Sequence, residues 1–107
     1  MSRSSAESEW KLFRKLQPIA LERFCQRVLA EVERIAANTK KTSHERYLAV
    51  FKLIEKRDEE LAAAFDNPRR STFFRQLAFI ESLKLLTEEE MAGFSSETRE
   101  TLAIWQK

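Results

Sequence analysis

Apolar residues recur at intervals of three and four positions along much of the chain, which is the spacing of amphipathic helices. The clearest run lies between Pro18 and Ala37, with apolar residues at Leu21, Phe24, Cys25, Val28, Val32 and Ile35. The polar segment 38–41 then predicts the end of this helix. A shorter apolar face precedes it, at Trp10, Phe13 and Leu16.

A serine and a proline delimit the first helical segment. Ser4 and Glu7 have the spacing of a capping box, so we expect the helix to begin near Ser4 and residues 1–4 to form a frayed tail. Pro18 lacks the N–H group that a helix interior needs, although it fits a first turn. The sequence therefore predicts a break or kink near Leu16 and a second helix from Pro18.

A third helix is predicted from Thr42 to Phe65. Thr42 and Glu45 match another capping box. The apolar stripe of this helix, which we expect to face the core, comprises Tyr47, Leu48, Phe51, Ile54, Leu61, Ala62 and Phe65. Asp58 interrupts the stripe, and the simplest explanation for it is a salt bridge to Arg57, Arg69 or Arg70.

The segment from Pro68 to Leu85 is apolar around most of its circumference. Asn67 is placed to act as the N-cap, and Pro68 to occupy the first helical position. The apolar residues are Phe73, Phe74, Leu77, Ala78, Phe79, Ile80 and Leu83. A helix of this kind lies at the centre of a core or in an oligomer interface.

Two short helices are predicted after this segment. Thr87 and Glu90 match a third capping box, and Leu86 and Met91 have the spacing of a hydrophobic staple. We expect this helix to end near Gly93. A last helix, capped by Ser95 or Ser96, should carry Leu102, Ile104 and Trp105.

The composition agrees with an all-α fold. Sheet hairpins need glycine and other turn residues, whereas this chain has one Gly and two Pro in 107 residues. Strong helix formers dominate it instead. We therefore predict one compact domain, residues 1–107, built as a bundle of five to six helices, three of them long.

Charge and cysteine content add little to this picture. The net charge of +2 is too small to indicate a nucleic-acid partner, although residues 1–57 hold 13 Lys/Arg and 7 Asp/Glu and residues 58–107 hold 6 and 10. Cys25 is the single cysteine, and its place on an apolar stripe favours a core residue over a reactive thiol. Neither a signal peptide nor a membrane-spanning run is evident, so we expect a cytoplasmic protein.

Residues for catalysis and metal binding are few. The chain has one histidine, His44, and one glycine, Gly93, so a hydrolytic triad, a zinc site and a phosphate-binding loop all lack their usual residues. The acidic run Glu88–Glu90 is explained by the dipole of the helix that it begins. The sequence thus predicts no catalytic residue, no metal and no cofactor, and a protein that is not an enzyme.

The first of two basic clusters comprises Arg69, Arg70 and Arg75. Two of them fall in the first turn of the helix predicted from Pro68, where the partial positive charge of the helix disfavours cations. One explanation is a bound anion, which arginines at a helix N-terminus hold well. The other is an internal salt bridge to Asp58, Glu59 or Asp66.

The second basic cluster is the stripe of Arg23, Arg27 and Arg34, which share one side of their helix. Such a stripe is typical of an electrostatic footprint for nucleic acid. Glu22, Glu31 and Glu33 are interspersed with it, so a solvated face of mixed charge explains it too.

Eleven aromatic residues are many for a small monomer, and excess apolar surface is often buried by association. The alternative is that the other helices simply wrap the apolar segment after Pro68. Our leading hypothesis is a non-catalytic protein–protein interaction or oligomerisation module, with self-association as a homodimer. The candidate interface residues are Trp10, Phe13, Phe73, Phe79 and Trp105. The alternative hypothesis is a helical protein that binds nucleic acid or an anion.

Three stretches, residues 44–51, 66–71 and 85–90, carry a resemblance to known proteins. With them the chain resembles an uncharacterised family of small all-helical bacterial proteins. The resemblance implies a helical fold and brings no known catalytic or binding residues. Some such proteins are labelled as binding components of peptide transporters, a role for which this chain is too short.

Overall fold

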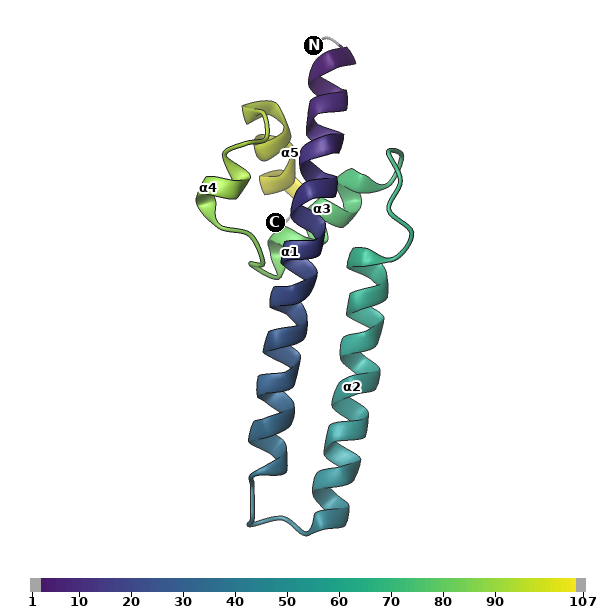
Figure 1. Ribbon diagram of the computed structural model, residues 1–107, viewed down its shortest axis with the longest axis vertical. Helices are drawn as coiled ribbons and strands as arrows, with labels where there is room; N and C mark the ends of the chain where they lie inside the picture. Colours follow the sequence, from purple (N-terminus) through teal and green to yellow (C-terminus); the bar gives the residue numbers. More distant parts are fainter. Residues whose placement is uncertain (1–2, 106–107) are drawn as a thin grey trace.

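The computed structural model describes residues 3–105, and these form five helices and no strand (Figure 1). The helices are α1 (Arg3–Ala36), α2 (Ser43–Phe65), α3 (Phe73–Ser82), α4 (Glu88–Met91) and α5 (Ser96–Trp105). The all-α prediction is confirmed. Two of the helices are long, where the sequence led us to expect three.

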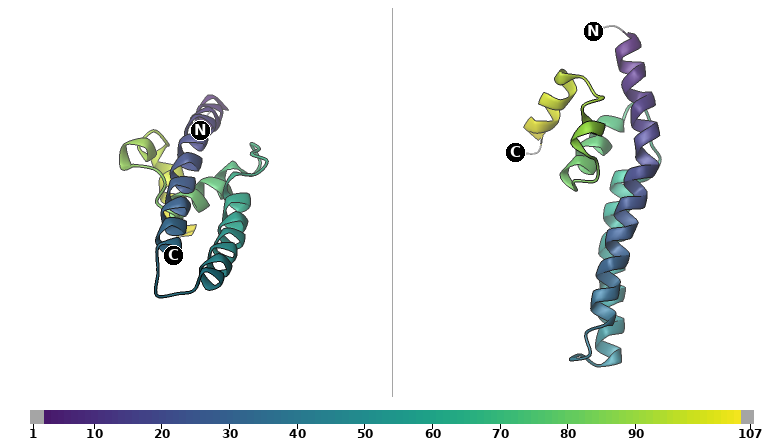
Figure 2. Two further views of the ribbon diagram at one scale, coloured as in Figure 1. Left: turned by 60° about the horizontal axis from the view of Figure 1, so that its bottom comes forward. Right: turned by 60° about the vertical axis from the view of Figure 1, so that its left-hand side comes forward.

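The molecule is elongated, which differs from the compact bundle that we expected. It measures 59 × 24 × 24 Å, and its radius of gyration is 16.9 Å, whereas a compact domain of this length has about 13 Å. Helices α1 and α2 form an antiparallel hairpin, and α3, α4 and α5 gather beside the N-terminal half of α1 (Figures 1 and 2). We call residues 25–61 of the hairpin the arm, and the rest of the molecule the head.

Helix α1 runs through Pro18 without the predicted break. A proline inside a helix removes one backbone hydrogen bond and costs about 3 kcal/mol. This cost is offset because one face of α1 is buried on both sides of the proline, at Phe13, Leu16, Ala20 and Phe24. The predicted N-cap is also wrong, because α1 already includes Ser4 and the carboxylate of Glu7 accepts hydrogen bonds from Arg70.

Helix α3 begins at Phe73, five residues later than predicted. Asn67 has a φ of 52°, which is the left-handed region and not the extended conformation of an N-cap. The chain instead makes a turn, closed by a hydrogen bond from the Thr72 N–H to the Arg69 carbonyl. Arg69 and Arg70 therefore do not lie in the first turn of a helix.

The two strongest capping predictions are confirmed. The Thr42 and Thr87 hydroxyls each accept a hydrogen bond from the backbone N–H of the glutamate three residues later, and that glutamate's carboxylate bonds back to the threonine N–H. Ser95 caps α5, because its hydroxyl accepts from the Thr98 N–H at 3.1 Å. These caps depend only on groups within one helical turn.

The hydrophobic core lies in the head. Its largest fully buried side chains come from α1, α3 and the segments around α4, and they are Phe13, Leu77, Ile80, Leu85 and Phe94. The last turn of α2 joins this core through Ala64 and Phe65. Leu83, after the last turn of α3, meets the arm only near its base, beside Val28, and toward the tip the arm has its own two helices to bury apolar surface.

Candidate interaction surface

The predicted apolar stripe of α2 faces solvent along the arm. Tyr47 is 66% exposed, Phe51 53%, Ile54 42% and Leu48 40%. The side of α2 that turns toward α1 carries other residues, which are Arg46, Val50, Leu53, Arg57 and Ala64. The expectation that the stripe packs into the core is wrong for these four residues, because a contact between two helices buries one narrow seam and α3–α5 lie beside the N-terminal half of α1, away from the tip of the arm (Figures 1 and 2).

Helix α1 adds to the same surface. Leu29 is 59% exposed, and it lines a groove of about 330 Å³ that runs between the two helices of the arm. The groove is bounded by Phe24, Cys25, Val28, Leu29, Ile54, Arg57, Asp58 and Leu61. Phe51 and Tyr47 continue from Ile54 at helical spacing and are exposed, so they continue the apolar surface beyond the groove toward the tip of the arm.

We call this surface the arm face, and it comprises Cys25, Leu29, Tyr47, Leu48, Phe51, Ile54 and Leu61. A contiguous exposed surface with this many large apolar side chains is typical of an interaction site. The sequence does hold a signal for this surface, because the short connection 37–42 predicts a hairpin of two helices, and the seam between two helices buries only one side of each.

The carboxylate of Asp58 borders the arm face, and Arg57, the cation that lines the same groove, is paired with Glu31 and Glu60. Asp58 lies on the groove, is exposed, and takes part in no ion pair among residues 3–105. Two of its three expected partners, Arg57 and Arg70, pair with other carboxylates. Arg57 donates to both oxygens of Glu31 at 3.0 Å and to Glu60 at 2.9 Å, and Arg70 pairs with Glu7.

The Arg57–Glu31 contact ties the two helices of the arm together. Its bidentate hydrogen bonds from Arg57 lower the pKa of Glu31, and those from Glu31 and Glu60 raise the pKa of Arg57. Arg57 thus pairs with Glu31 and Glu60, and the adjacent Asp58 carboxylate is exposed and outside this pairing.

Comparisons of this chain with protein-family models, with curated proteins and with solved structures found no match. Its function therefore has to be argued from its own surfaces.

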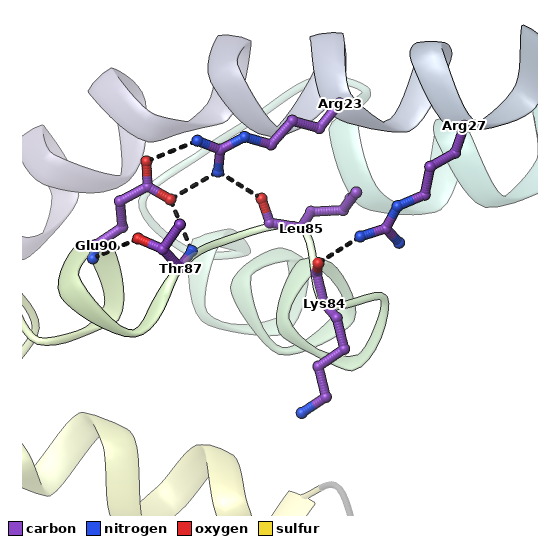
Figure 3. Close-up of polar contacts among 6 residues, drawn as sticks. All are labelled: Arg23, Arg27, Lys84, Leu85, Thr87 and Glu90. Atoms are coloured by element: carbon purple, nitrogen blue, oxygen red, sulfur yellow. Dashed lines mark hydrogen bonds and ion pairs between the residues drawn. The ribbon is translucent and has the colours of Figure 1, made fainter. Parts of the chain in front are cut away.

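Two arginines of the predicted basic stripe hold the head together (Figure 3). Arg23 donates to both oxygens of Glu90, at 2.7 and 3.1 Å, and to the Leu85 carbonyl at 2.8 Å. Arg27 donates to the Leu83 carbonyl and, at 2.5 Å, to that of Lys84. Both side chains fasten α1 to the connection between α3 and α4, where the end of α3 leaves carbonyls without helical partners.

This arrangement also sets the charge of Glu90. The hydrogen bonds from Arg23, followed by the backbone N–H of Thr87, lower the pKa of Glu90 to about 2. The third arginine of the stripe, Arg34, is exposed on the arm. Two arginines of the stripe thus make internal contacts and the third faces solvent. The spacing of the three residues in the sequence does not reveal this difference.

The first basic cluster, which comprises Arg69, Arg70 and Arg75, does not lie at a helix N-terminus. Arg70 donates to both oxygens of Glu7, at 3.2 and 2.9 Å, and lies 5.4 Å from the centre of the Trp10 ring. The internal salt bridge of the two sequence alternatives therefore exists for Arg70, although its partner is in α1 and was not foreseen. Arg75 is exposed on α3.

Most of the predicted aromatic anchors lie inside the head. Trp10 and Phe13 are buried, and both pack against Phe73, with ring centres 5.9 and 5.5 Å apart. Phe73 and Phe79 are half-buried against the core. Trp105 alone among the five is largely exposed, at 55%, with its ring edge-on to Phe74. Apart from Ile19, Ile104 and Trp105, the large apolar side chains that are exposed among the described residues belong to the arm face.

The described part of the chain contains no group of three or more His, Cys, Asp and Glu side chains that could hold a metal ion. None of its helices is both long and apolar enough to cross a membrane. His44 is exposed at the start of α2, and Cys25 is a free, half-buried thiol on the arm face.

Proposed function

We propose that this protein is a non-catalytic interaction module that binds a protein partner through the arm face. The observation that carries the proposal is the row of exposed side chains Leu29, Tyr47, Leu48, Phe51 and Ile54 on two neighbouring helices. Removing apolar surface from water yields about 25 cal/mol per Å². A partner that covers this row would therefore gain a substantial stabilisation.

The chemistry of the arm face suits a protein better than nucleic acid. Base stacking on aromatic side chains works beside cations that neutralise phosphates, whereas the groove next to Ile54 carries the unpaired carboxylate of Asp58. Arg23, Arg27 and Arg70, on which the alternative hypothesis relied, make internal contacts instead. We expect sedimentation of the protein to be unchanged by a short DNA duplex at low salt.

The proposal assigns no catalytic residue, metal or cofactor to this chain. It places the module in the cytoplasm, where a lone thiol such as Cys25 stays reduced.

Affinity capture with matched variants tests the proposal. Phe51→Glu puts a charge at the middle of the arm face, and Ala63→Glu puts the same charge at an exposed position on the opposite side of α2. A specific partner, whether a second copy or another protein, should bind the wild type and Ala63→Glu and be lost from Phe51→Glu. Purified components must reproduce the result.

If Phe51→Glu and Ala63→Glu retain the same partners, with the helical content of both unchanged, the arm face is not the binding surface and the proposal fails. A partner released by duplex DNA or by substitution of Arg34 and Arg75 would instead favour the nucleic-acid hypothesis.

A further inference from the structure

Basic and acidic side chains stand at opposite ends of the arm face. At the tip, Lys40 and Lys41 are exposed cations and the imidazole of His44 is exposed, while the carboxylate of Glu45 accepts a hydrogen bond from the Thr42 N–H. At the end nearer the head, Glu22 and Asp58 are exposed, and neither takes part in an ion pair within residues 3–105. The apolar side chains lie between these two ends.

The pattern along α2 is symmetric about Phe51. His44 precedes Phe51 by seven residues and Asp58 follows it by seven, and residues seven apart lie on one side of a helix. Leu48 and Ile54 lie three residues from Phe51 in opposite directions. Tyr47 and Glu55 lie four residues away.

A second α2 laid antiparallel over the first, with a two-fold axis at Phe51, uses this symmetry. Each His44 then faces Asp58 of the second copy, each Leu48 faces Ile54, and each Tyr47 hydroxyl can donate to Glu55. The lysines of the tip come to the acidic end that includes Glu22. A parallel arrangement would place like charges together, so the charges select the antiparallel one.

The size of the arm face is adequate for such a pair. From Lys41 to Glu22 it spans about 30 Å and is two helices wide, about 20 Å, so a second arm would cover on the order of 600 Å² per copy. Standard interfaces bury about 800 Å² per partner. Two hairpins packed in this way form a four-helix bundle, whose core buries the one face that a single hairpin leaves open.

We infer that the arm face is the surface on which a second copy of this chain docks, antiparallel, with the acidic end of each arm on the basic tip of the other. This inference rests on the proposed function and names its partner. A foreign partner would not need a surface whose charges complement themselves about a central residue. The self-complementary order His44, Phe51, Asp58 is therefore the argument for a second copy.

Charge exchange tests the inference. In one variant, Asp58→Lys makes the acidic end basic. In the other, Lys41→Glu with His44→Glu makes the tip acidic, and negative charge in the first turn of α2 is favourable for the helix. By sedimentation velocity, wild type should be a dimer, and each variant alone should dimerise at least about tenfold more weakly because two like-charged contacts replace two attractive ones.

An equimolar mixture of the two variants should dimerise about as tightly as wild type, because both end contacts are again between opposite charges. A single chain carrying all three substitutions should do the same. Lys56→Glu, on the polar side of α2, is the control and should leave the dimer intact. The reaction of Cys25 with a maleimide should slow as the dimer forms, since this thiol lies on the arm face.

Wild type that remains monomeric at about 100 μM would overturn the inference, as would two weakened variants whose mixture is no tighter than either alone. In both cases the proposed function is decided separately by the Phe51→Glu capture experiment. A foreign protein that still requires Phe51 would leave that function standing with a different partner, whereas a wild-type protein that captures no partner at all would remove both.

Discussion

The carboxylate of Glu90 accepts hydrogen bonds from two different parts of the chain. Its Oε1 accepts from the Thr87 N–H at 2.8 Å, which closes the capping box of α4, and both of its oxygens accept from Arg23 of α1. The first contact is local, and the second joins residues 67 positions apart. The start of the small helix α4 is thus held to the long helix by one side chain.

The low pKa of Glu90 predicts a loss of stability in acid. The pKa falls from an ordinary value of 4.5 to about 2 in the folded state. A carboxyl with a lowered folded pKa contributes stability above its unfolded value, and this contribution is lost as the pH falls through 4.5 toward 2. The free energies of unfolding of wild type and Glu90→Gln, measured in denaturant, should therefore differ at pH 7 and become equal near pH 2. An equal difference at both pH values would show that the ionised Glu90 carboxylate is not the source of the stability.

Lys84 adopts a conformation that suits glycine. Its φ is 57°, and it follows the end of α3 where the Lys84 N–H bonds to Glu81 and the Leu85 N–H bonds to Ile80. This pattern is a Schellman motif, whose left-handed position glycine fills without strain. Lys84→Gly should raise the free energy of unfolding by about 1 kcal/mol, measured in urea. Lys84→Ala, which keeps the side-chain strain, should give no gain.

At the level of elements, the long helix α1 contributes to both the head and the arm. Its N-terminal half supplies Trp10, Phe13, Leu16 and Ala20 to the core of the head, and its C-terminal half is one side of the arm. Pro18 lies between the two halves, exposed on the helix surface. The continuity of α1 is therefore imposed by packing and opposed by local preference.

Pro18→Ala should stabilise the protein, because alanine restores the missing backbone N–H and the best intrinsic helix propensity. We expect a gain of about 2–3 kcal/mol, seen as a higher melting temperature. A decrease would mean that the fold of the head needs the local geometry that proline gives to α1.

At the level of the whole molecule, stability is unevenly distributed between head and arm. The buried side chains come mainly from the head, where α1 meets α3 and the segments around α4 and α5. The arm is held by the seam between α1 and α2, which includes the Arg57–Glu31 pair, and by little other burial. Regions with few buried contacts open locally at low free-energy cost.

Amide hydrogen exchange should separate the two regions. In dilute protein, residues 40–50 should exchange faster than residues 13–24 of α1, because the tip can fray without unfolding the head. At dimer-forming concentrations the tip should gain protection, and Phe51→Glu should abolish that gain. Uniform protection along the chain at every concentration would contradict the division into head and arm.

Local chemistry was enough to predict the helical segments and several of their ends, although not the continuity of α1 through Pro18 or the later start of α3. The caps at Thr42, Thr87 and Ser95 were predictable because each depends on a side chain and an N–H within one turn. The scarcity of glycine was likewise enough to predict the all-α class. These features need no knowledge of distant residues.

Tertiary structure decided which faces of the helices are buried and which arginines make internal contacts. The apolar stripe of α2 was recognised, yet whether it meets core or solvent depends on how far α3–α5 reach along the hairpin. Arg23 and Arg70 were placed on plausible surfaces, yet their partners are 67 and 63 residues away. Sequence spacing reports only neighbours along a helix, so long-range contacts of this kind, and the arm face that they leave open, emerge only when the chain is folded.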